Sequence, residues 1–174
     1  VSGAGAQGIV ELDEQLQAIA AGEEFEPRVF ARQIAFNVIP QVDAFTENGY
    51  TKEEMKMQNE GRKILGLPDL RVSCTCVRVP VQRSHSVAMT AQFSNPVGPD
   101  AARAAFDGHP GVKVVDDPEN GGYPVPLDTT GKDDCLVGRI RKSLVLENAL
   151  DLWVVGDQVR KGAALNAVQI AELL

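Results

Sequence analysis

Apolar residues recur three or four positions apart from Ile9 to Ile19, and Gly22 follows them. This spacing predicts an amphipathic helix that ends at the glycine, because glycine readily adopts the left-handed conformation that closes a helix. A charged stretch then leads to a shorter apolar run at residues 33–40, which ends in proline. That run predicts a short strand or an extended segment.

A second helix is predicted over about residues 52–65 by its N-terminal signal. Thr51 precedes Glu54 by three positions, as in a capping box, where each side chain binds the other residue's backbone N–H. Glu60 and Lys63 lie three positions apart on one face of this helix. They can form a solvated ion pair, or they can face a cleft and bind a substrate's ammonium and anionic groups.

A strand-turn-strand is predicted over residues 71–79 and 85–94. The second strand alternates polar and apolar residues, which indicates one buried face in an antiparallel sheet. In such a hairpin Arg78 and His85 stand opposite each other, with Cβ atoms roughly 5 Å apart. A cation beside an imidazole suits an anionic substrate, whereas the alternative is a solvated arginine and a histidine without chemistry.

The remaining pattern predicts further strands and two more helices. Proline near one end and glycine after the other mark a short helix at residues 99–106. The last stretch leads into a helix that ends at Leu174. Gly162 and the two alanines after it allow a flat ligand or another helix to approach closely, and Asn166 offers a donor and an acceptor. Strands are expected at residues 112–115, 136–140 and 150–155.

Composition restricts the class of protein. The 174 residues suffice for one domain with a core of its own. The 17 basic and 24 acidic residues give a net charge of −7, which argues against nucleic acid as a partner. The sequence contains no apolar run as long as a membrane span. The three cysteines, Cys74, Cys76 and Cys135, fit neither a zinc site nor a disulfide framework, so a cytoplasmic location is expected.

The first residues include a glycine pattern. Gly3, Gly5 and Gly8 satisfy G-x-G-x-x-G, but a dinucleotide fingerprint requires a strand directly before it, and Val1 is the first residue. The alternative is a glycine-rich entry into the first helix, whose free N–H groups could still bind an anion. The abrupt start on Val1 indicates a fragment of a longer chain.

Several segments together resemble one family, the NADP-dependent aspartate-semialdehyde dehydrogenases, and specifically their C-terminal half. The resemblance covers essentially all of the sequence. It is carried by VSGAG at residues 1–5, QIAFNVIP at 33–40, EGRKILG at 60–66, TCVRVPV at 75–81, VGRIR at 137–141 and LNAVQIAEL at 165–173.

The resemblance implies roles for four substrate-site residues. His85 is the expected acid/base catalyst, and Arg78 binds the substrate α-carboxylate. Glu60 binds the α-ammonium group, and Lys63 helps to bind phosphate. These expectations agree with the chemistry of the side chains, since imidazole titrates near neutral pH and guanidinium offers a planar fork that matches a carboxylate.

The resemblance also implies a cofactor and a reaction. Ser2 and Gly3 are expected to line the nicotinamide site, and Asn166 is expected to contact NADP. The implied reaction converts aspartyl phosphate and NADPH into aspartate semialdehyde, NADP and phosphate, on the route to lysine, threonine and methionine. A cysteine thiolate carries the acyl group in this family, but its Asn-Cys-Thr-Thr motif and the NADP-binding domain would lie upstream of Val1. Neither Cys76 nor Cys135 matches that motif, so the chain alone is expected to be inactive.

The expected fold is α+β: an antiparallel-rich mixed sheet with helices on one face, resembling the catalytic and dimerisation domain of the glyceraldehyde-phosphate dehydrogenase superfamily. Residues 1–174 form its single C-terminal domain, and the other face of the sheet pairs with a second subunit to give a homodimer. Two alternatives stay open. One is a non-catalytic dimerisation and substrate-recognition module, and the other is a related acyl-phosphate reductase with another substrate.

Overall fold

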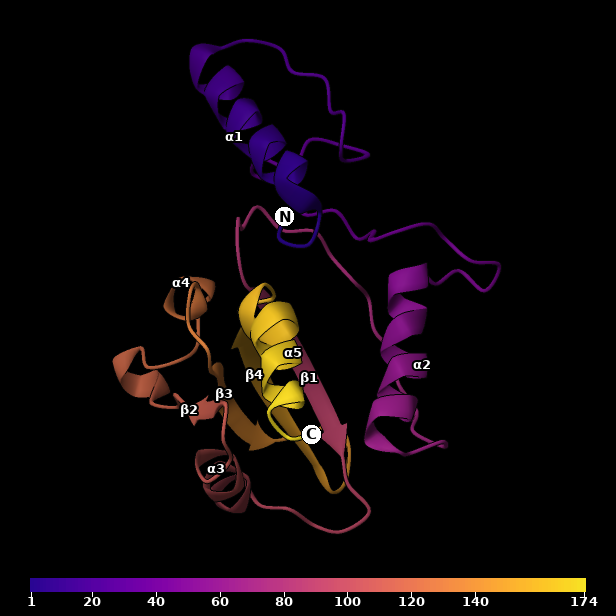
Figure 1. Cartoon of the computed structure of the whole chain (residues 1–174), viewed down its shortest axis with the longest axis vertical. Coiled ribbons are helices and arrows are strands. Elements are labelled where there is room, and N and C mark those ends of the chain that lie inside the picture. Colours follow the sequence, from indigo (N-terminus) through magenta and orange to yellow (C-terminus); the bar gives the residue numbers. More distant parts are fainter. The chain divides into compact units, whose positions relative to one another are not determined.

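The two long helices of the chain and its sheet belong to different parts of the structure (Figure 1). The computed structural model describes all 174 residues and divides into two units. The first unit comprises Val1 and residues 3–80, and the second comprises Ser2 and residues 81–174. Two units can belong to one domain, so the single domain expected over residues 1–174 stays a prediction.

The first helix of the first unit, α1, runs over Gly5–Ala21. Gly22 closes it in the left-handed conformation, with φ 73°, as the sequence predicts. The inner side of α1 packs on a small apolar core. The buried members of this core are Val1, Leu12, Phe30, Ile34, Ala35 and Ile39.

Two buried polar side chains of α1 hold the irregular segment that follows the helix. The carboxylate of Glu11 accepts hydrogen bonds from the backbone N–H groups of Arg28, Val29 and Phe30. Gln15 accepts from two further backbone N–H groups, at residues 34 and 35, and donates to Glu11. This segment has no strand ladder, so these side chains supply the partners that its buried backbone requires.

The second helix, α2, spans Lys52–Leu65 and confirms both the predicted bounds and the predicted capping box. Glu54 N–H donates to Thr51 Oγ1 over 3.3 Å, and Glu54 Oε2 accepts from Thr51 N–H over 2.7 Å. The other oxygen of Glu54 accepts from Cys76 N–H over 2.8 Å. The cap therefore also attaches the extended segment before residue 80 to the start of α2.

The predicted strand over residues 71–79, and with it the predicted hairpin, is wrong. This segment is extended, but its only ladder-type pairing is a single bridge between Arg78 and Ile39. The run at residues 33–40 contains a turn, with φ 58° at Phe36, and takes part only in that bridge. Neither segment pairs with a strand of regular length. Some of their own backbone N–H groups donate to side chains instead, those of Ile34 and Ala35 to Gln15 and that of Cys76 to Glu54.

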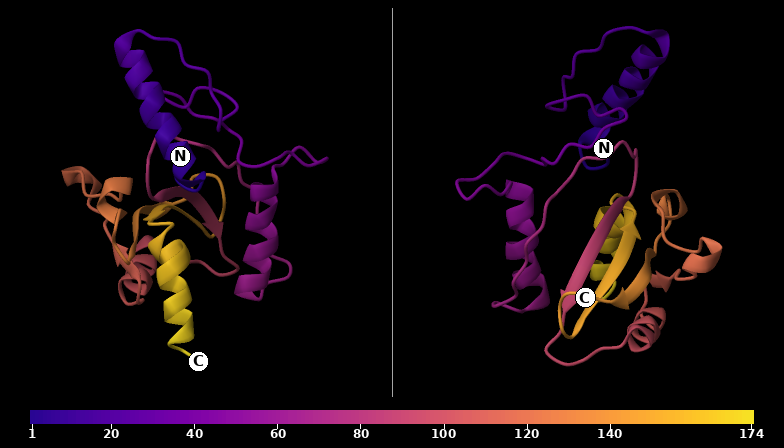
Figure 2. Two further views of the ribbon diagram at one scale, coloured as in Figure 1. Left: turned by 45° about the horizontal axis from the view of Figure 1, so that its top comes forward. Right: turned by 180° about the vertical axis from the view of Figure 1, so that it is seen from behind.

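The second unit contains a four-stranded sheet with the order β1-β4-β3-β2 (Figures 1 and 2). The β1–β4 and β4–β3 pairs are antiparallel, and the β3–β2 pair is parallel. This confirms the mixed, largely antiparallel α+β fold. The strands are β1 at His85–Gln92, β2 at Val112–Val114, β3 at Cys135–Lys142 and β4 at Ala149–Gly156.

Helix α3 at Pro99–Asp107 covers the core of this sheet. Ala102 and Phe106 of α3 pack against apolar side chains of the strands, among which Val137 and Leu150 are almost fully buried. The segment between β2 and β3 carries a 3₁₀ turn, η1, at Pro118–Asn120 and one turn of helix, α4, at Pro126–Thr129.

Strand β3 depends on a glycine and a buried carboxylate. A Cβ at Gly138 would lie 2.0 Å from the carbonyl oxygen of Val115, so only glycine permits this approach of the neighbouring backbone. Beyond it the strand bulges at Arg139, where φ is 55°. The Asp116 carboxylate accepts from Arg139 N–H over 2.6 Å and from the Arg103 guanidinium over 2.8 Å, which fixes the bulge.

The last part of the chain forms a π-helical turn, η2, at Arg160–Ala164 and then α5 at Leu165–Ala171. This confirms the predicted terminal helix. Helix α5 lies on one side of the sheet, in front of β1 and β4 in Figure 1 and behind them in the right-hand view of Figure 2. None of the helices has the length and apolar character needed to cross a bilayer.

Strand β1 differs from the expectation of one buried face. Val87 and Met89 pair directly with β4 residues of the core face, yet they are 45% and 42% exposed. The reason is that β1 is the edge strand, and α3 covers the core face of the sheet at β2 and β3 but not at β1.

We predict that Glu11→Ala lowers the free energy of unfolding by about 2 to 4 kcal/mol, because buried N–H groups lose their acceptor. Urea denaturation of the protein measures this loss. Glu14→Ala is the matched control on the same helix. Its exposed ion pair with Arg28 should contribute less than about 1 kcal/mol. Equal losses in the two variants would contradict the role assigned to Glu11.

Candidate active site

His85 is the first residue of β1, and its exposed side chain lies at the end of the sheet. The antiparallel register pairs it with Gly156, the last residue of β4. Its Nε2 lies 3.4 Å from the carbonyl oxygen of Ser2, to which the Nε2–H tautomer can donate. Ser2 and His85 both belong to the second unit, so the structure brings these two predicted residues together.

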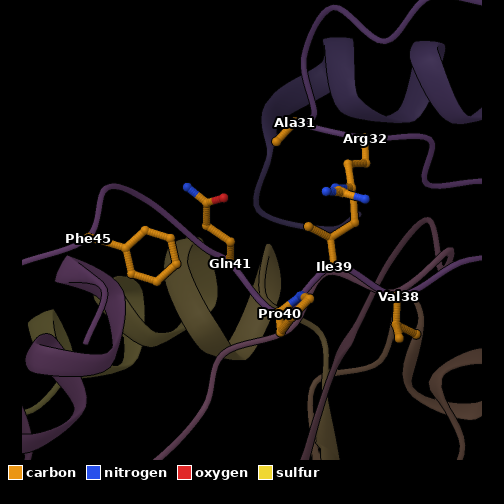
Figure 3. A pocket seen from close by; sticks show the side chains of 7 residues that line it. All are labelled: Ala31, Arg32, Val38, Ile39, Pro40, Gln41 and Phe45. Carbon is orange, nitrogen blue, oxygen red and sulfur yellow. The ribbon is translucent and has the colours of Figure 1, made fainter. Parts of the chain in front are cut away.

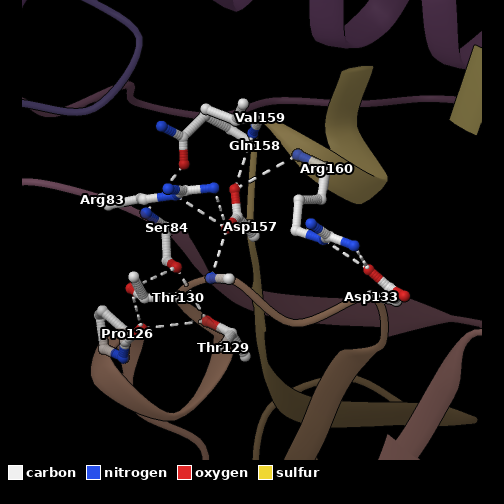
Figure 4. Close-up of polar contacts among 11 residues, drawn as sticks. Arg83, Ser84, Pro126, Thr129, Thr130, Asp133, Asp157, Gln158, Val159 and Arg160 are labelled. Carbon is white, nitrogen blue, oxygen red and sulfur yellow. Dashed lines mark hydrogen bonds and ion pairs between the residues drawn. The ribbon is translucent and has the colours of Figure 1, made fainter. Parts of the chain in front are cut away.

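The turn before His85 is held in an unusual conformation. Ser84 is 4% exposed and has φ 76°, in the left-handed region that non-glycine residues seldom adopt. Its N–H donates to Gln158 Oε1 over 2.8 Å, and its carbonyl accepts from Ser2 Oγ over 3.0 Å. Its hydroxyl lies 2.9 Å from that of Thr129 and 3.3 Å from that of Thr130. Every polar atom of Ser84 is therefore bound, and Figure 4 shows its contacts with Gln158, Thr129 and Thr130.

Asp157, the residue directly after β4, binds the same turn. Its carboxylate is fully buried and lies 2.9 Å from the Arg83 guanidinium (Figure 4). Burial by itself would raise the pKa of this carboxyl. Hydrogen bonds from Gly131, Val159, Arg83 and Arg160 outweigh burial and hold the pKa below its ordinary value. Asp157 therefore carries a negative charge at neutral pH.

Arg78 lies in the extended segment of the first unit, half-buried. Its backbone exchanges two hydrogen bonds with Ile39, of 2.8 and 3.0 Å, which fix the position of its Cα. The sequence predicts that Arg78 lies opposite His85 in a hairpin. That hairpin is absent, because β1 pairs with β4.

Glu60 and Lys63 lie one turn apart on the exposed side of α2. They do not form the ion pair that was one of the two interpretations of this spacing. The ion pair of α2 joins Lys56 and Glu53 over 2.9 Å. Glu60 and Lys63 are therefore available to bind charged groups from solution.

The candidate cofactor residues lie in different surroundings. Gly3 has φ 84° in the turn before α1, where a side chain would be strained. Ser2 Oγ donates to the Ser84 carbonyl, its N–H donates to the Val81 carbonyl over 3.4 Å, and its own carbonyl lies beside His85 Nε2. Asn166, the second residue of α5, is exposed and its amide makes no hydrogen bond within the chain. Backbone groups and a free amide are of the kind that can bind a carboxamide, the group that a nicotinamide presents.

The thiols do not have the properties of an activated nucleophile. All three cysteines are free. Burial, with the neighbouring Cys74 as a smaller cause, raises the pKa of Cys76 to about 11. Burial also raises the pKa values of Cys74 and Cys135. A cysteine nucleophile reacts as the thiolate, so none of these thiols suits that role at neutral pH.

The first unit also contains an open hollow of about 210 Å³ (Figure 3). Most of its lining is apolar, and only Arg32 and Gln41 bring polar side chains to it. It contains none of the candidate site residues, so we assign it no catalytic role. Its lining residues are Ala31, Arg32, Val38, Ile39, Pro40, Gln41 and Phe45.

Chemically, the second unit can transfer protons and orient a ligand beside Ser2. An imidazole can give and take a proton near neutral pH, and the bound turn restricts its direction. The first unit offers a guanidinium, a carboxylate and an ammonium group, the set that an amino-acid phosphate requires.

Sequence reasoning missed the residues that hold the turn, namely Arg83, Ser84, Asp157 and Gln158. Asp157 carried one usable signal, because aspartate directly before a helix is a frequent N-terminal cap. Ser84 carried none, since serine gives no indication of a left-handed conformation.

The fold is that of a dimerisation domain of the semialdehyde dehydrogenases, and the model of that family, "Semialdehyde dehydrogenase, dimerisation domain", matches residues 1–161. The chain is 49% identical to the aspartate-semialdehyde dehydrogenase of Aquifex aeolicus over 175 aligned positions, which cover all of this chain and 52% of that protein. The chain belongs to the family of semialdehyde dehydrogenase dimerisation domains, and it spans about half the length of the aspartate-semialdehyde dehydrogenases it matches.

Solved structures agree with this assignment. Aspartate semialdehyde dehydrogenase II of Vibrio cholerae, in complex with ASA, superimposes with a TM-score of 0.95 at 45% identity, over 99% of this chain and 51% of that one. The aspartate semialdehyde dehydrogenase of Candida albicans with NADP gives a TM-score of 0.62 at 25% identity, over 82% and 45% of the two chains.

We predict that Cys76 is alkylated slowly by iodoacetamide and that its rate rises about tenfold per pH unit from pH 7 to 9.5. With a pKa of about 11, the thiolate fraction at pH 8 is about 0.1%, against about a quarter for an ordinary thiol. Mass spectrometry of the modified peptide measures the rate. The urea-unfolded chain is the control, and its rate should level off near pH 9. A plateau at that pH in the folded protein would refute the raised pKa.

Proposed function

We propose that the chain is part of an enzyme that converts aspartyl phosphate and NADPH into aspartate semialdehyde, NADP and phosphate. This reaction leads toward lysine, threonine and methionine. The observation that carries the proposal is an imidazole, that of His85, directly after Ser84, whose polar atoms are all bound, in a chain that matches these dehydrogenases over its whole length.

In this proposal His85 is the acid/base catalyst. It takes a proton from the nucleophile as the acyl-enzyme bond forms and returns a proton to the developing oxyanion or leaving group. The exposure of its ring and its position beside the Ser2 carbonyl support this role. Arg78 binds the α-carboxylate through its planar fork, Glu60 the α-ammonium group and Lys63 the phosphate. The absence of ion pairs at Glu60 and Lys63 supports their assignment.

We assign NADP contacts to Ser2 and Gly3, beside the nicotinamide, and to Asn166. NADPH supplies the hydride of the reaction. The free amide of Asn166 and the side-chain-free backbone of Gly3 support the assignment, as does the NADP present in the Candida albicans relative. The proposed cysteine nucleophile is not one of the three thiols in this chain, since burial raises all of their pKa values. The 174 residues alone are therefore proposed to be inactive.

The proposal includes a homodimer formed through this domain, as the family description indicates. The loop between β3 and β4 carries Leu144 and Val145, which are 99% and 87% exposed. It borders an open hollow of about 720 Å³ that Arg141 and Asp151 also line. Exposed aliphatic side chains beside a hollow are typical of a protein interface, and a second copy is the partner we propose. A module that only dimerises and recognises substrate is the alternative function.

We also propose a cytoplasmic location. Three free thiols without a disulfide are typical of proteins in a reducing compartment.

His85→Asn tests the catalytic proposal in the full-length enzyme that contains this domain. We expect kcat to fall about 10²- to 10⁴-fold with an unchanged melting temperature, because a proton carrier is lost from an exposed position. Phosphate-dependent NADP reduction with aspartate semialdehyde measures kcat. His109→Asn is the matched control, because this second histidine is exposed and its ring contacts only the neighbouring Pro110 carbonyl. Full activity of His85→Asn would exclude the proposed role and favour the non-catalytic module.

Leu144→Asp combined with Val145→Asp tests the dimer. We expect the dissociation constant of the dimer to rise at least about 30-fold, because two charges would be buried at the interface. Light scattering after size-exclusion chromatography measures the mass of the particle. Leu127→Asp, at an 86% exposed position on α4, should leave the dimer intact. A double variant that stays dimeric at low micromolar concentration would place the interface elsewhere.

A further inference from the structure

The carboxylate of Asp157 binds two parts of the second unit at once (Figure 4). Its Oδ2 accepts from the Arg83 guanidinium over 2.9 Å and from Gly131 N–H over 2.7 Å. Its Oδ1 accepts from Val159 N–H over 2.8 Å and from Arg160 N–H over 3.3 Å, at the start of the terminal helical segment. One buried side chain thus joins the turn before His85 to the helix that carries Asn166.

The turn requires such an anchor because its backbone is strained. A left-handed serine costs roughly 1 to 2 kcal/mol, so Ser84 keeps φ 76° only while its surroundings oppose relaxation. Arg83 precedes it and is fixed by Asp157, and Gln158, the residue after Asp157, binds the Ser84 N–H. A change at Ser84 would redirect β1's first side chain, which is His85.

We propose that Asp157, together with its neighbour Gln158, is a positioning residue that holds Ser84 in the left-handed conformation and thereby directs the His85 imidazole toward its working position. The inference rests on the proposed function, in which His85 transfers protons. Asp157 is fully buried and makes no hydrogen bond to His85, so it acts through Arg83, Ser84 and the helix start.

A carboxylate is the appropriate group for this position, since all four groups around it are donors. In Asp157→Asn one oxygen becomes an NH₂ group, which in either orientation faces N–H donors. The variant therefore keeps the size of the side chain while it loses both the charge and two of its acceptor contacts.

The test is a double-mutant cycle between Asp157→Asn and His85→Asn in the full-length enzyme. We expect Asp157→Asn to lower kcat about 10- to 100-fold and to change KM for aspartate semialdehyde less than about threefold, because displacement of a reacting group costs rate more than binding. In the His85→Asn background the same substitution should lower kcat less than about threefold. A misplaced imidazole no longer matters once it has been removed.

Three outcomes decide the question. Equal losses in the two backgrounds would show that Asp157 acts on stability or on another group, and would overturn the inference. Full activity of Asp157→Asn beside an impaired His85→Asn would overturn the inference and leave the proposed function standing. Full activity of His85→Asn would overturn the proposed function and this inference with it.

Gln158→Ala gives a second route that keeps the buried charge in place, and it decides the matter if Asp157→Asn does not fold. It removes only the acceptor of the Ser84 N–H, so we expect a three- to tenfold loss of kcat that also disappears in the His85→Asn background. A loss that persists there would overturn the inference. Asp133→Asn is the control, because its ion pair with Arg160 is exposed and does not touch the turn. Its kcat should stay within about twofold of the unmodified enzyme.

Discussion

Buried carboxylates that accept several backbone N–H groups hold this chain together where regular structure ends. Glu11 binds the loop after α1, and Glu54 binds both the start of α2 and the extended segment at Cys76. Asp116 fixes the bulge of β3, and Asp157 fixes the turn before β1. An ionised carboxylate has about four acceptor sites, so one side chain can satisfy several donors that lack a ladder partner. The irregular segments between helices and strands therefore have side-chain partners for backbone donors that no strand ladder satisfies.

The stability that these buried carboxylates provide depends on pH. Hydrogen bonds from Thr51 and Cys76 lower the pKa of Glu54, and for Asp157 the hydrogen bonds outweigh the opposing effect of burial and lower the pKa as well. A carboxyl whose pKa is lower in the folded state stabilises that state above its ordinary pKa. The stabilisation disappears as the pH falls through the lowered value, when the proton binds and the acceptor sites are lost. Acid is thus the condition that removes the anchors of both units.

Local sequence signals predicted the elements that local interactions form. The helical spacing up to Gly22, the Thr51 capping box and the alternation in β1 each gave an element with nearly correct bounds, because each signal lies inside the element it predicts or directly beside it. The strand expected over residues 71–79 failed for the opposite reason. Whether an extended segment becomes a strand depends on a partner, and the partner of β1 is β4, more than 60 residues further on. Alternation of polar and apolar residues predicts a strand, but it does not predict which strand pairs with it.

The candidate site likewise contains side chains that the sequence singles out and supporting groups that it does not. The roles proposed for side chains with reactive chemistry, such as His85 and Arg78, come from motifs that resemble a known family. The groups that hold them could not be predicted, since Asp157 reaches Arg83 across 74 positions of sequence and Ser84 has no local reason to be left-handed. The imidazole lies exposed at the end of an edge strand, where packing alone restricts a side chain little. The direction of such a group must come from the backbone that precedes it, and that backbone is fixed by an ion pair and hydrogen bonds buried behind it.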